Sequence, residues 1–249
     1  IDIAVDLKGY TRETRSGIFA YRAAPVQINL LGYPGTMGAE FIDYIVADKI
    51  LIPYENRNFF SEKIIYMPHT YQVTDNQRVI SQKVFSRSEM NLPESAFVFC
   101  CFSESYKISH IEFDIWMRIL HKVKKSVLWL IKSNNFAEKN LNSEAVKRGV
   151  NSDRLIFAEK LPQAEHLARY KLADLFLDTF NVNAHTTASD ALWAGLPVIT
   201  KIGKGFPARV AGSILNAIGL QELIVKNEKD YHCHMFISPH AEFSHVGSL

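Results

Sequence analysis

Four residues in one short stretch carry side chains suited to binding an anion: His185, Thr186, Thr187 and Asp190. They follow the apolar run 175–177, so the order predicted is strand, loop, helix. In a parallel sheet such a loop lies at the carboxyl edge of the strands, and the helix after it offers free backbone N–H groups. The threonines add hydroxyls and the histidine adds a titratable donor. The stretch therefore predicts a phosphate site.

The same residues also fit a purely structural interpretation. Thr187 or Ser189 can cap the helix and Asp190 can complement its dipole, each contributing about 1 kcal/mol. Gly195 is placed to end the helix as its C′ residue. These residue types alone do not separate capping from anion binding, so the elements around them must decide.

Strands and helices alternate along the chain, which is typical of a parallel α/β sheet. The apolar runs predict strands at residues 1–7, 26–31, 44–47, 63–70, 96–102, 126–131, 155–158, 175–177 and 197–200. Helices are expected at residues 54–62, 111–123, 138–148, 162–169 and 208–215, with a helix or an irregular basic segment at 12–24. The fold class predicted is α/β, with a doubly wound parallel sheet in each half.

Apolar density falls between residues 72 and 93, where the domain boundary is placed. The predicted division is 1–80, 81–231 and a divergent or truncated tail at 232–249, which shows no amphipathic helix period. Because a buried strand is expected directly at Ile1, we expect the chain to begin inside a larger protein.

Composition narrows the class of protein. The 249 residues are 47% hydrophobic and 22% charged, with a formal net charge of +2. This charge is too small for a nucleic-acid footprint, and no basic block predicts a membrane or DNA contact. No apolar run approaches the ~18 residues of a membrane span, and no signal peptide is recognisable, so a cytoplasmic location is expected.

The three cysteines predict neither a disulfide framework nor a familiar zinc site. Cys100 and Cys101 stand side by side in an apolar run and are expected to be reduced core residues. A metal set is conceivable where His232, Cys233, His234 and His240 gather near the end of the chain. Their spacing matches no common zinc pattern, so no metal site is predicted.

Several short motifs together resemble the catalytic region of the O-GlcNAc transferase family, from residue 1 to about 231. The order and approximate spacing of many motifs agree, which makes the resemblance specific. They are DLKGYT (6–11), LGYPGT (31–36), YMPHT (66–70), YKI (106–108), VLWL (127–130), the spacing from Pro162 to His166, LDT (177–179), HTT (185–187) and DALWAG (190–195).

The resemblance implies the two-lobed GT-B fold, here with part of the N-terminal lobe missing. It also implies inverting transfer of GlcNAc from UDP-GlcNAc to Ser or Thr of a protein acceptor, with no metal or other cofactor. Tetratricopeptide repeats are expected upstream in the full-length protein. Two alternatives stay open: a glucosyltransferase of the same fold that acts on protein Asn, and an inactive nucleotide-binding or partner-binding remnant.

Carried over from the family, Lys107 and His185 are the expected catalytic residues. Lys107 would contact the diphosphate of the donor, and His185, Thr186 and Thr187 would hold the same phosphates from the other side. Without a metal, a leaving UDP needs such groups to stabilise its growing charge. Asp190 would accept a hydrogen bond from a ribose hydroxyl.

The uracil end of the donor is expected further along the chain, at Leu161, Pro162, Gln163, His166 and Arg169. The first three would offer backbone to the uracil edge, and the last two would pack against the base or bond to it. The last two can also form an ordinary exposed polar pair, since they lie at i and i+3 of a helix.

Glu104 is a departure from the family, which commonly has Asn or Gln in this loop. It is counted among the donor-site residues, but a carboxylate next to a diphosphate is unfavourable unless it points away. The acceptor is expected over residues 32–38, a glycine-rich loop at the cleft between the lobes.

Overall fold

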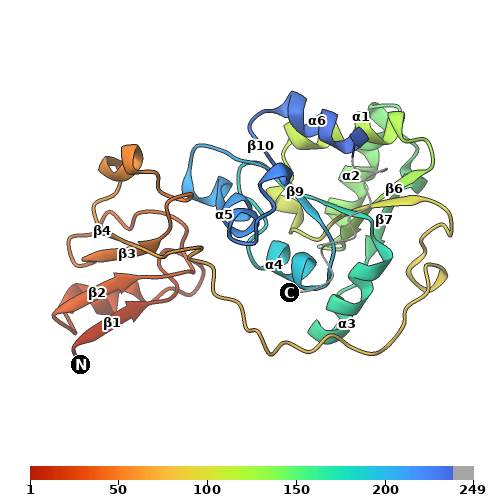
Figure 1. The fold of residues 1–249 in the computed structure, drawn as a ribbon. Coiled ribbons are helices and arrows are strands. Elements are labelled where there is room, and N and C mark those ends of the chain that lie inside the picture. Colours follow the sequence, from red (N-terminus) through yellow and green to blue (C-terminus); the bar gives the residue numbers. More distant parts are fainter. Residues whose placement is uncertain (238–249) are drawn as a thin grey trace.

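The computed structural model describes residues 1–237, which form two lobes joined by a long linker, residues 67–96 (Figure 1). The first lobe is built on a four-stranded parallel sheet in the order β1-β2-β3-β4. Its elements are β1 (Ile3–Asp6), η1 (Ser16–Tyr21), β2 (Val26–Asn29), β3 (Tyr44–Ala47), η2 (Tyr54–Phe59) and β4 (Lys63–Tyr66). Two of the three connections between these strands hold a 3-10 helix, and the β2–β3 connection holds no helix, in place of the α-helices expected for a doubly wound sheet.

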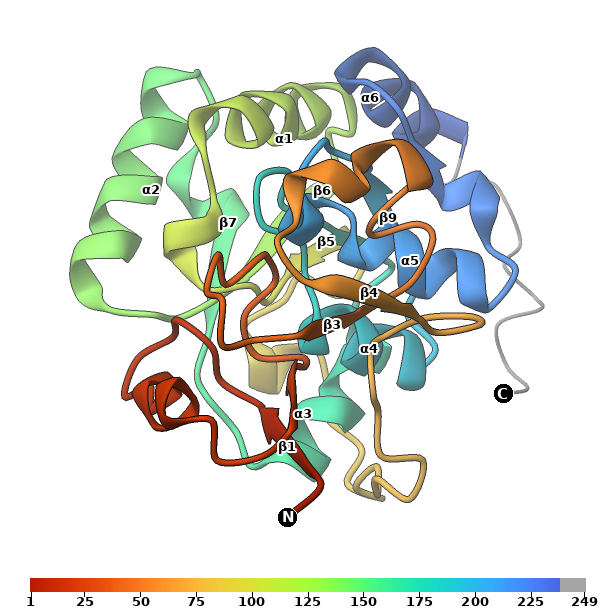
Figure 2. The same ribbon diagram turned by 90° about the vertical axis from the view of Figure 1, so that its left-hand side faces the viewer.

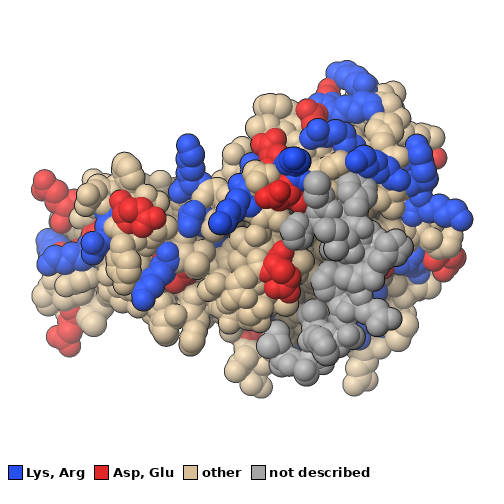
Figure 3. Space-filling view, turned by 45° about the horizontal axis from the view of Figure 1, so that its top comes forward, with Lys and Arg blue, Asp and Glu red and all other residues tan. Residues whose placement is uncertain are grey.

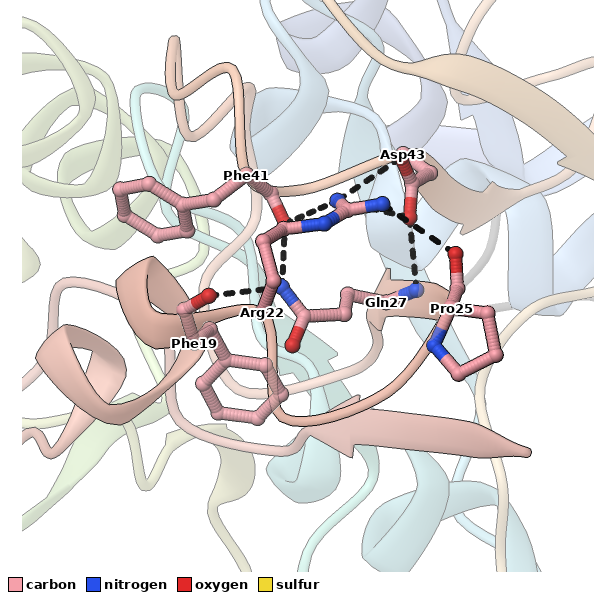
Figure 4. Close-up of polar contacts among 6 residues, drawn as sticks. All are labelled: Phe19, Arg22, Pro25, Gln27, Phe41 and Asp43. Atoms are coloured by element: carbon pink, nitrogen blue, oxygen red, sulfur yellow. Dashed lines mark hydrogen bonds and ion pairs between the residues drawn. The ribbon is translucent and has the colours of Figure 1, made fainter. Parts of the chain in front are cut away.

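Polar contacts hold the irregular connections of this lobe in place (Figure 4). The buried Gln27 donates from Nε2 to the carbonyl oxygens of Phe19 and Phe41, at 2.8 and 2.6 Å. Arg22 pairs with Asp43 at 3.0 Å, and the Asp43 carboxylate also accepts the backbone N–H of Gln27 at 2.8 Å. In this lobe, side-chain hydrogen bonds thus hold the connections between the strands, whereas helices form most of these connections in the other lobe.

The second lobe contains a six-stranded parallel sheet in the order β10-β9-β8-β5-β6-β7. Its strands are β5 (Phe97–Cys101), β6 (Ser126–Ile131), β7 (Leu155–Ala158), β8 (Leu175–Leu177), β9 (Val198–Lys201) and β10 (Ile224–Val225). The helices are α1 (His110–Lys122), α2 (Asn135–Lys147), α3 (Gln163–Arg169), α4 (Thr186–Trp193), α5 (Val210–Ala217) and α6 (Glu228–Ile237). Short 3-10 turns are η3 (Ser88–Met90), η4 (Ser105–Lys107), η5 (Ser152–Arg154), η6 (Tyr170–Leu172), η7 (Phe206–Ala208) and η8 (Gln221–Leu223).

The lobes meet through a buried contact between the loop after β3 and helix α5, which lies next to the first lobe in both ribbon views (Figures 1 and 2). The Asp48 carboxylate, 1% exposed, accepts the Ser213 hydroxyl at 2.6 Å and the Tyr71 backbone N–H at 3.0 Å. The ring of Tyr71 also packs edge-on against Phe206. Because these groups are buried and bonded, the interface fixes the lobes against each other.

The two parallel sheets confirm the predicted GT-B-like architecture, and strands 44–47, 126–131, 155–158 and 175–177 match the predicted bounds. Gly195, with φ of +84°, ends α4 as predicted. The helix expected at 54–62 is instead the 3-10 helix η2. Helix α6 also continues to Ile237, so the first six residues of the predicted tail are helical. Residues 238–249 lie outside the described part.

Candidate functional site

The candidate site lies where the second sheet changes direction. After β5 the chain adds β6 and β7 on one side, then returns to place β8 on the other side of β5. The loops after β5 and β8 therefore diverge and leave a crevice at the carboxyl edge, where ligands bind in open α/β sheets. Lys107 follows β5 and His185 follows β8. The topology brings these two predicted residues to the same crevice.

Lys107 is fixed by the loop opposite. Its Nζ donates to the carbonyl oxygen of Asn183 at 3.2 Å. Burial lowers the pKa of Lys107, while the charges of Asp178 and Glu104 oppose that shift. A partly buried ammonium with one carbonyl partner has further donors for an anion. Its position fits the predicted diphosphate contact.

His185 is neutral at pH 7 in this site. Burial and the positive charge of Lys107 together lower its pKa to about 4, although the hydrogen bond to Pro207 opposes the shift. The ring nitrogen Nε2 lies 3.4 Å from the carbonyl oxygen of Pro207, which assigns the ring proton to that nitrogen. The other ring nitrogen donates only after His185 binds a second proton, so an arriving anion favours protonation here.

The N-terminus of α4 faces the same loop. His185 is its N-cap residue and makes no side-chain capping hydrogen bond. Thr187 and Ser189, the caps of the structural interpretation, lie inside the helix and do not occupy the N-cap position. Thr186 is exposed and Thr187 half-buried at the first helical positions. The first-turn N–H groups and positive dipole end of α4 thus add to the charge of Lys107.

Asp178 is a structural centre of the site, and the sequence analysis gave it no role beyond its place in the motif at residues 177–179. Its fully buried carboxylate accepts the backbone N–H groups of Thr179 and Ala184, at 2.8 and 2.6 Å, and the Thr200 hydroxyl at 2.6 Å. Burial raises the pKa of Asp178 to about 7, although these hydrogen bonds and the charge of Lys107 oppose the rise. By holding Ala184, Asp178 positions the loop that presents His185. An acidic residue directly after a fully apolar strand is the signal for it.

His166 and Arg169 come together, but with different exposure. Arg169 is 1% exposed and donates to the carbonyl oxygen of Glu159 and to Nδ1 of His166, both at 2.5 Å. Its guanidinium lies 4.5 Å from the ring centre of Phe102. Burial and the Arg169 charge lower the pKa of His166 to about 4, so its ring is neutral. Arg169 thus holds the half-buried His166, and it does not form the exposed polar pair that helical spacing alone allows.

The remaining predicted residues of this end lie after β7. Leu161 is half-buried, and Pro162 and Gln163 are exposed, with Pro162 as the N-cap residue of α3. The Pro162 carbonyl accepts the backbone N–H of His166 at 2.8 Å, and proline has no N–H of its own. The segment follows β7, Lys107 follows β5 and His185 follows β8, so all three lie at the carboxyl edge of one sheet, with β6 between β5 and β7.

Glu104 turns toward β6 and β7. Its carboxylate accepts the Ser133 hydroxyl at 2.9 Å and pairs with Lys160 at 3.1 Å. Burial alone would raise the pKa of Glu104, but these bonds and the charge of Lys107 bring it below its usual value. Both carboxylate oxygens are thus bonded on the side of β6 and β7, and Glu104 acts on Lys107 through its charge.

Asp190 is not open to solvent. Its carboxylate forms an ion pair with Arg78 of the linker, and both side chains are 9% exposed. Burial raises the pKa of Asp190, while the charge and hydrogen bond of Arg78 act against that rise. The sequence analysis did not identify Arg78, because nothing in its own neighbourhood sets it apart.

A cavity of about 340 Å³ lies between the lobes beside the site. Pro34, Gly35 and Thr36 of the first lobe and Phe206 and Pro207 of the second are among its lining residues. Since the Pro207 carbonyl also contacts His185, the cavity borders the anion site. The backbone of the glycine-rich loop approaches another part of the protein's own backbone closely. A Cβ at Gly32 would lie 2.1 Å from the carbonyl oxygen of Leu7.

Other predicted features have plain outcomes. Cys100 and Cys101 are free and buried, as predicted. Among the described residues, no three His, Cys, Asp or Glu side chains gather as a metal site requires. Of the possible metal set near the end of the chain, only the side chain of His232 is described.

Within the described part of the chain, none of the helices combines the length and the apolar character that crossing a membrane requires. The molecular surface carries both signs of charge. Figure 3 shows Lys and Arg interspersed with Asp and Glu over both lobes on the face drawn.

Two parallel α/β lobes with an anion-type crevice at the switch point of the second define a protein of the GT-B class. Glycosyl transferase family 41 matches residues 1–84 and 79–237, and the chain belongs to this family.

The relatives carry names that describe their own activity. The chain is 40% identical over 237 residues to a probable UDP-N-acetylglucosamine–peptide N-acetylglucosaminyltransferase SEC of Arabidopsis thaliana, covering 93% of this chain and 24% of that protein. It is 28% identical to the UDP-N-acetylglucosamine–peptide N-acetylglucosaminyltransferase of Caenorhabditis elegans, covering 93% and 30%. The chain thus spans only about a quarter to a third of the length of these relatives.

A solved structure supports the fold over nearly the whole chain. A mutant of the O-GlcNAc transferase from Thermobaculum terrenum superposes with a TM-score of 0.87 at 28% identity. The match covers 98% of this chain and 46% of that one. The two-lobed arrangement described above is therefore shared with a family relative.

Proposed function

We propose that this chain carries the donor site of a glycosyltransferase that moves GlcNAc from UDP-GlcNAc to Ser or Thr hydroxyls of proteins. The observation that carries the proposal is the meeting of Lys107, His185 and the N-terminus of α4 at one sheet edge. The names of the relatives support GlcNAc as the sugar and a peptide as the acceptor.

The diphosphate lies between Lys107 and the start of α4, with Thr186 and Thr187 beside it. The uracil ring lies against His166 and the backbone of residues 161–163. With this order of groups the sugar points toward the interlobe cavity, which has room for the acceptor. The two ends of the crevice thus separate base recognition from chemistry.

In the transfer step, the acceptor hydroxyl oxygen forms a bond to the anomeric carbon and gives up its proton to water or to the departing diphosphate. The bond from that carbon to the phosphate oxygen breaks at the same time, and UDP leaves with the electron pair. Lys107 and the helix N–H groups stabilise the charge that grows on this oxygen, and they do so without a metal. The attack inverts the anomeric centre, because nucleophile and leaving group lie on opposite sides.

Mass spectrometry of a Ser/Thr-bearing acceptor protein after incubation with the chain and UDP-GlcNAc tests this proposal. We expect addition of one N-acetylhexosamine, and β-elimination should remove it from the product. The transfer reaction should proceed equally well in the presence of EDTA. A product formed from UDP-glucose on Asn, and stable to β-elimination, would replace the proposal with the N-glucosyltransferase. Binding of UDP without any product from a folded chain would favour the inactive remnant.

A further inference from the structure

The Arg78–Asp190 pair joins the interlobe linker to the donor site. Residues 73–77 and Val79 of the linker are exposed, whereas the side chain of Arg78 is 9% exposed. Arg78 is therefore packed against helix α4, although the linker residues around it face solvent. An arginine taken out of water in this way is stable only with a partner, and Asp190 is that partner.

Arg78 is held from several sides. Its Nε donates to the carbonyl oxygen of Asp75 at 3.2 Å, and its guanidinium lies 5.5 Å from the ring centre of Trp193. The indole N–H of Trp193 donates in turn to the Arg78 carbonyl oxygen at 3.3 Å. Because Asp190 and Trp193 lie one helical turn apart, both ends of Arg78 contact the same face of α4.

The pair does not use the whole hydrogen-bonding capacity of Arg78. Its Nη2 is buried and has no hydrogen-bond partner among the described residues. The guanidinium therefore keeps a donor for a further acceptor beside Asp190. An ion pair that served only to fasten the linker would leave no reason for this group to be buried unpaired.

We propose that Arg78 is a positioning residue of the donor site, which orients the Asp190 carboxylate for a ribose hydroxyl and makes nucleotide recognition depend on the linker. This rests on the proposed function, since Asp190 is the expected ribose acceptor. Without Arg78, the Asp190 carboxylate loses the ion-pair partner that it has among the described residues. It then turns or takes up a proton, and a protonated carboxyl is a weaker acceptor.

A second linker arginine is a matched control. Arg87 pairs with Asp174 at 3.4 Å and donates to the carbonyl oxygen of Ala96 at 2.6 Å. It joins the same linker to the same lobe, but Asp174 stands just before β8, at the opposite edge of the sheet from the site. Arg87→Ala therefore reports what a loosened linker does by itself.

The experiment compares binding of UDP and of 2′,3′-dideoxy-UDP to the full chain by calorimetry. The wild type is expected to prefer UDP by about 10-fold, the worth of a hydrogen bond to a charged group. In Arg78→Ala this preference falls to about 1, with dideoxy-UDP binding little changed. Arg78→Lys recovers part of the preference, and Arg87→Ala keeps all of it.

Two results overturn the proposal while leaving the proposed function intact. One is an Arg78→Ala chain that binds UDP and still prefers it over dideoxy-UDP as the wild type does. The other is an equal loss of preference in Arg87→Ala, which would assign the effect to the linker in general. Absence of UDP binding by the folded wild type would instead overturn the proposed function itself.

Discussion

Both lobes are built on a parallel sheet, but the strands of the second lobe are much more deeply buried than those of the first. In the second lobe, β5, β6 and β8 are buried along almost their whole length, and helices cover the sheet. In the first lobe, alternate residues of β1 are exposed, including Ile3 at 56% and Val5 at 42%. A strand with one open face loses apolar burial worth about 25 cal/mol per Å². The lobe that carries the donor site is thus the better-stabilised one.

The difference in burial indicates which lobe holds its functional residues more firmly. The residues that meet at the crevice are anchored by a fully buried sheet and by the Asp178 hydrogen bonds. The first lobe contributes the loop at residues 34–36 to the cavity wall and is held by side-chain contacts such as those of Gln27. We therefore expect donor binding to depend on the second lobe and its linker, and acceptor placement to depend on both.

The largest expected difference between the lobes is in amide hydrogen exchange. Exchange in β5, β6 and β8 requires opening of the buried sheet, whereas β1 and β4 open locally, so we expect rates at least about 100-fold slower in the former. UDP should slow exchange further at residues 104–107 and 183–190. Exchange at one common rate, measured by mass spectrometry, would show that both lobes open as a unit.

Asp178 offers the next largest effect. Asp178→Ala leaves the N–H groups of Thr179 and Ala184 buried without an acceptor and is expected to cost about 2–4 kcal/mol of unfolding free energy. Asp178→Asn keeps an acceptor and is expected to cost less. Urea denaturation measures both. Equal costs for the two variants would contradict the role given to these hydrogen bonds.

The same group predicts a pH dependence. The native pKa of Asp178, about 7, lies above its ordinary value of 3.8, so the native state binds the proton more tightly than the unfolded chain. Its contribution to stability therefore decreases as the pH rises from about 4 to about 7. Asp178→Asn should be less stable than wild type at pH 5 and lose that deficit by pH 8. A deficit that is the same at both pH values would refute this.

A smaller effect is expected at His185, which should take up a fraction of a proton when UDP binds. Its pKa of about 4 rises when a diphosphate binds beside it, so UDP binding at pH 5.5 should take up protons. Calorimetry in buffers of different ionisation enthalpy measures this uptake. His185→Gln should abolish it, whereas His166→Gln, at a histidine with the same pKa, should preserve it. Uptake that follows His166 instead would reverse the proposed orientation of the donor.

Glu104 carries the smallest expected effect. Its carboxylate is bonded to Ser133 and Lys160, yet its charge still acts on Lys107. Glu104→Gln should tighten UDP binding by about 2–3-fold at low salt and less at high salt, since partly exposed charges are screened. Weaker binding in the variant would show that the carboxylate helps to hold the donor.

Local patterns were sufficient for most of the fold. Residues 126–131, 155–158 and 175–177 match their strands because a fully buried strand is an uninterrupted apolar run. The helix predicted at residues 54–62 was wrong in type, because a 3-10 helix shows the same short-range composition as the start of an α-helix. The continuation of α6 to Ile237 was missed for lack of an apolar stripe.

The site was predictable only where it follows strand ends. Lys107 and His185 lie in the connections that follow apolar runs, so sheet topology was enough to bring them together. The Arg78–Asp190 pair joins residues 112 positions apart, and no local pattern encodes it. The carboxylate of Asp178 turns inward because three donors converge on it, which only the folded backbone reveals.

The central claim, that the second lobe holds a nucleotide-diphosphate site, is tested most directly by titrating the full chain with UDP in a calorimeter. Lys107→Ala should weaken binding by about 10–100-fold, the worth of a hydrogen bond to a charged group. Lys147→Ala, which removes an exposed lysine paired with Glu144 on α2, should leave binding within about 2-fold. No heat from the folded wild type, or equal binding by the wild type and Lys107→Ala, would contradict the claim.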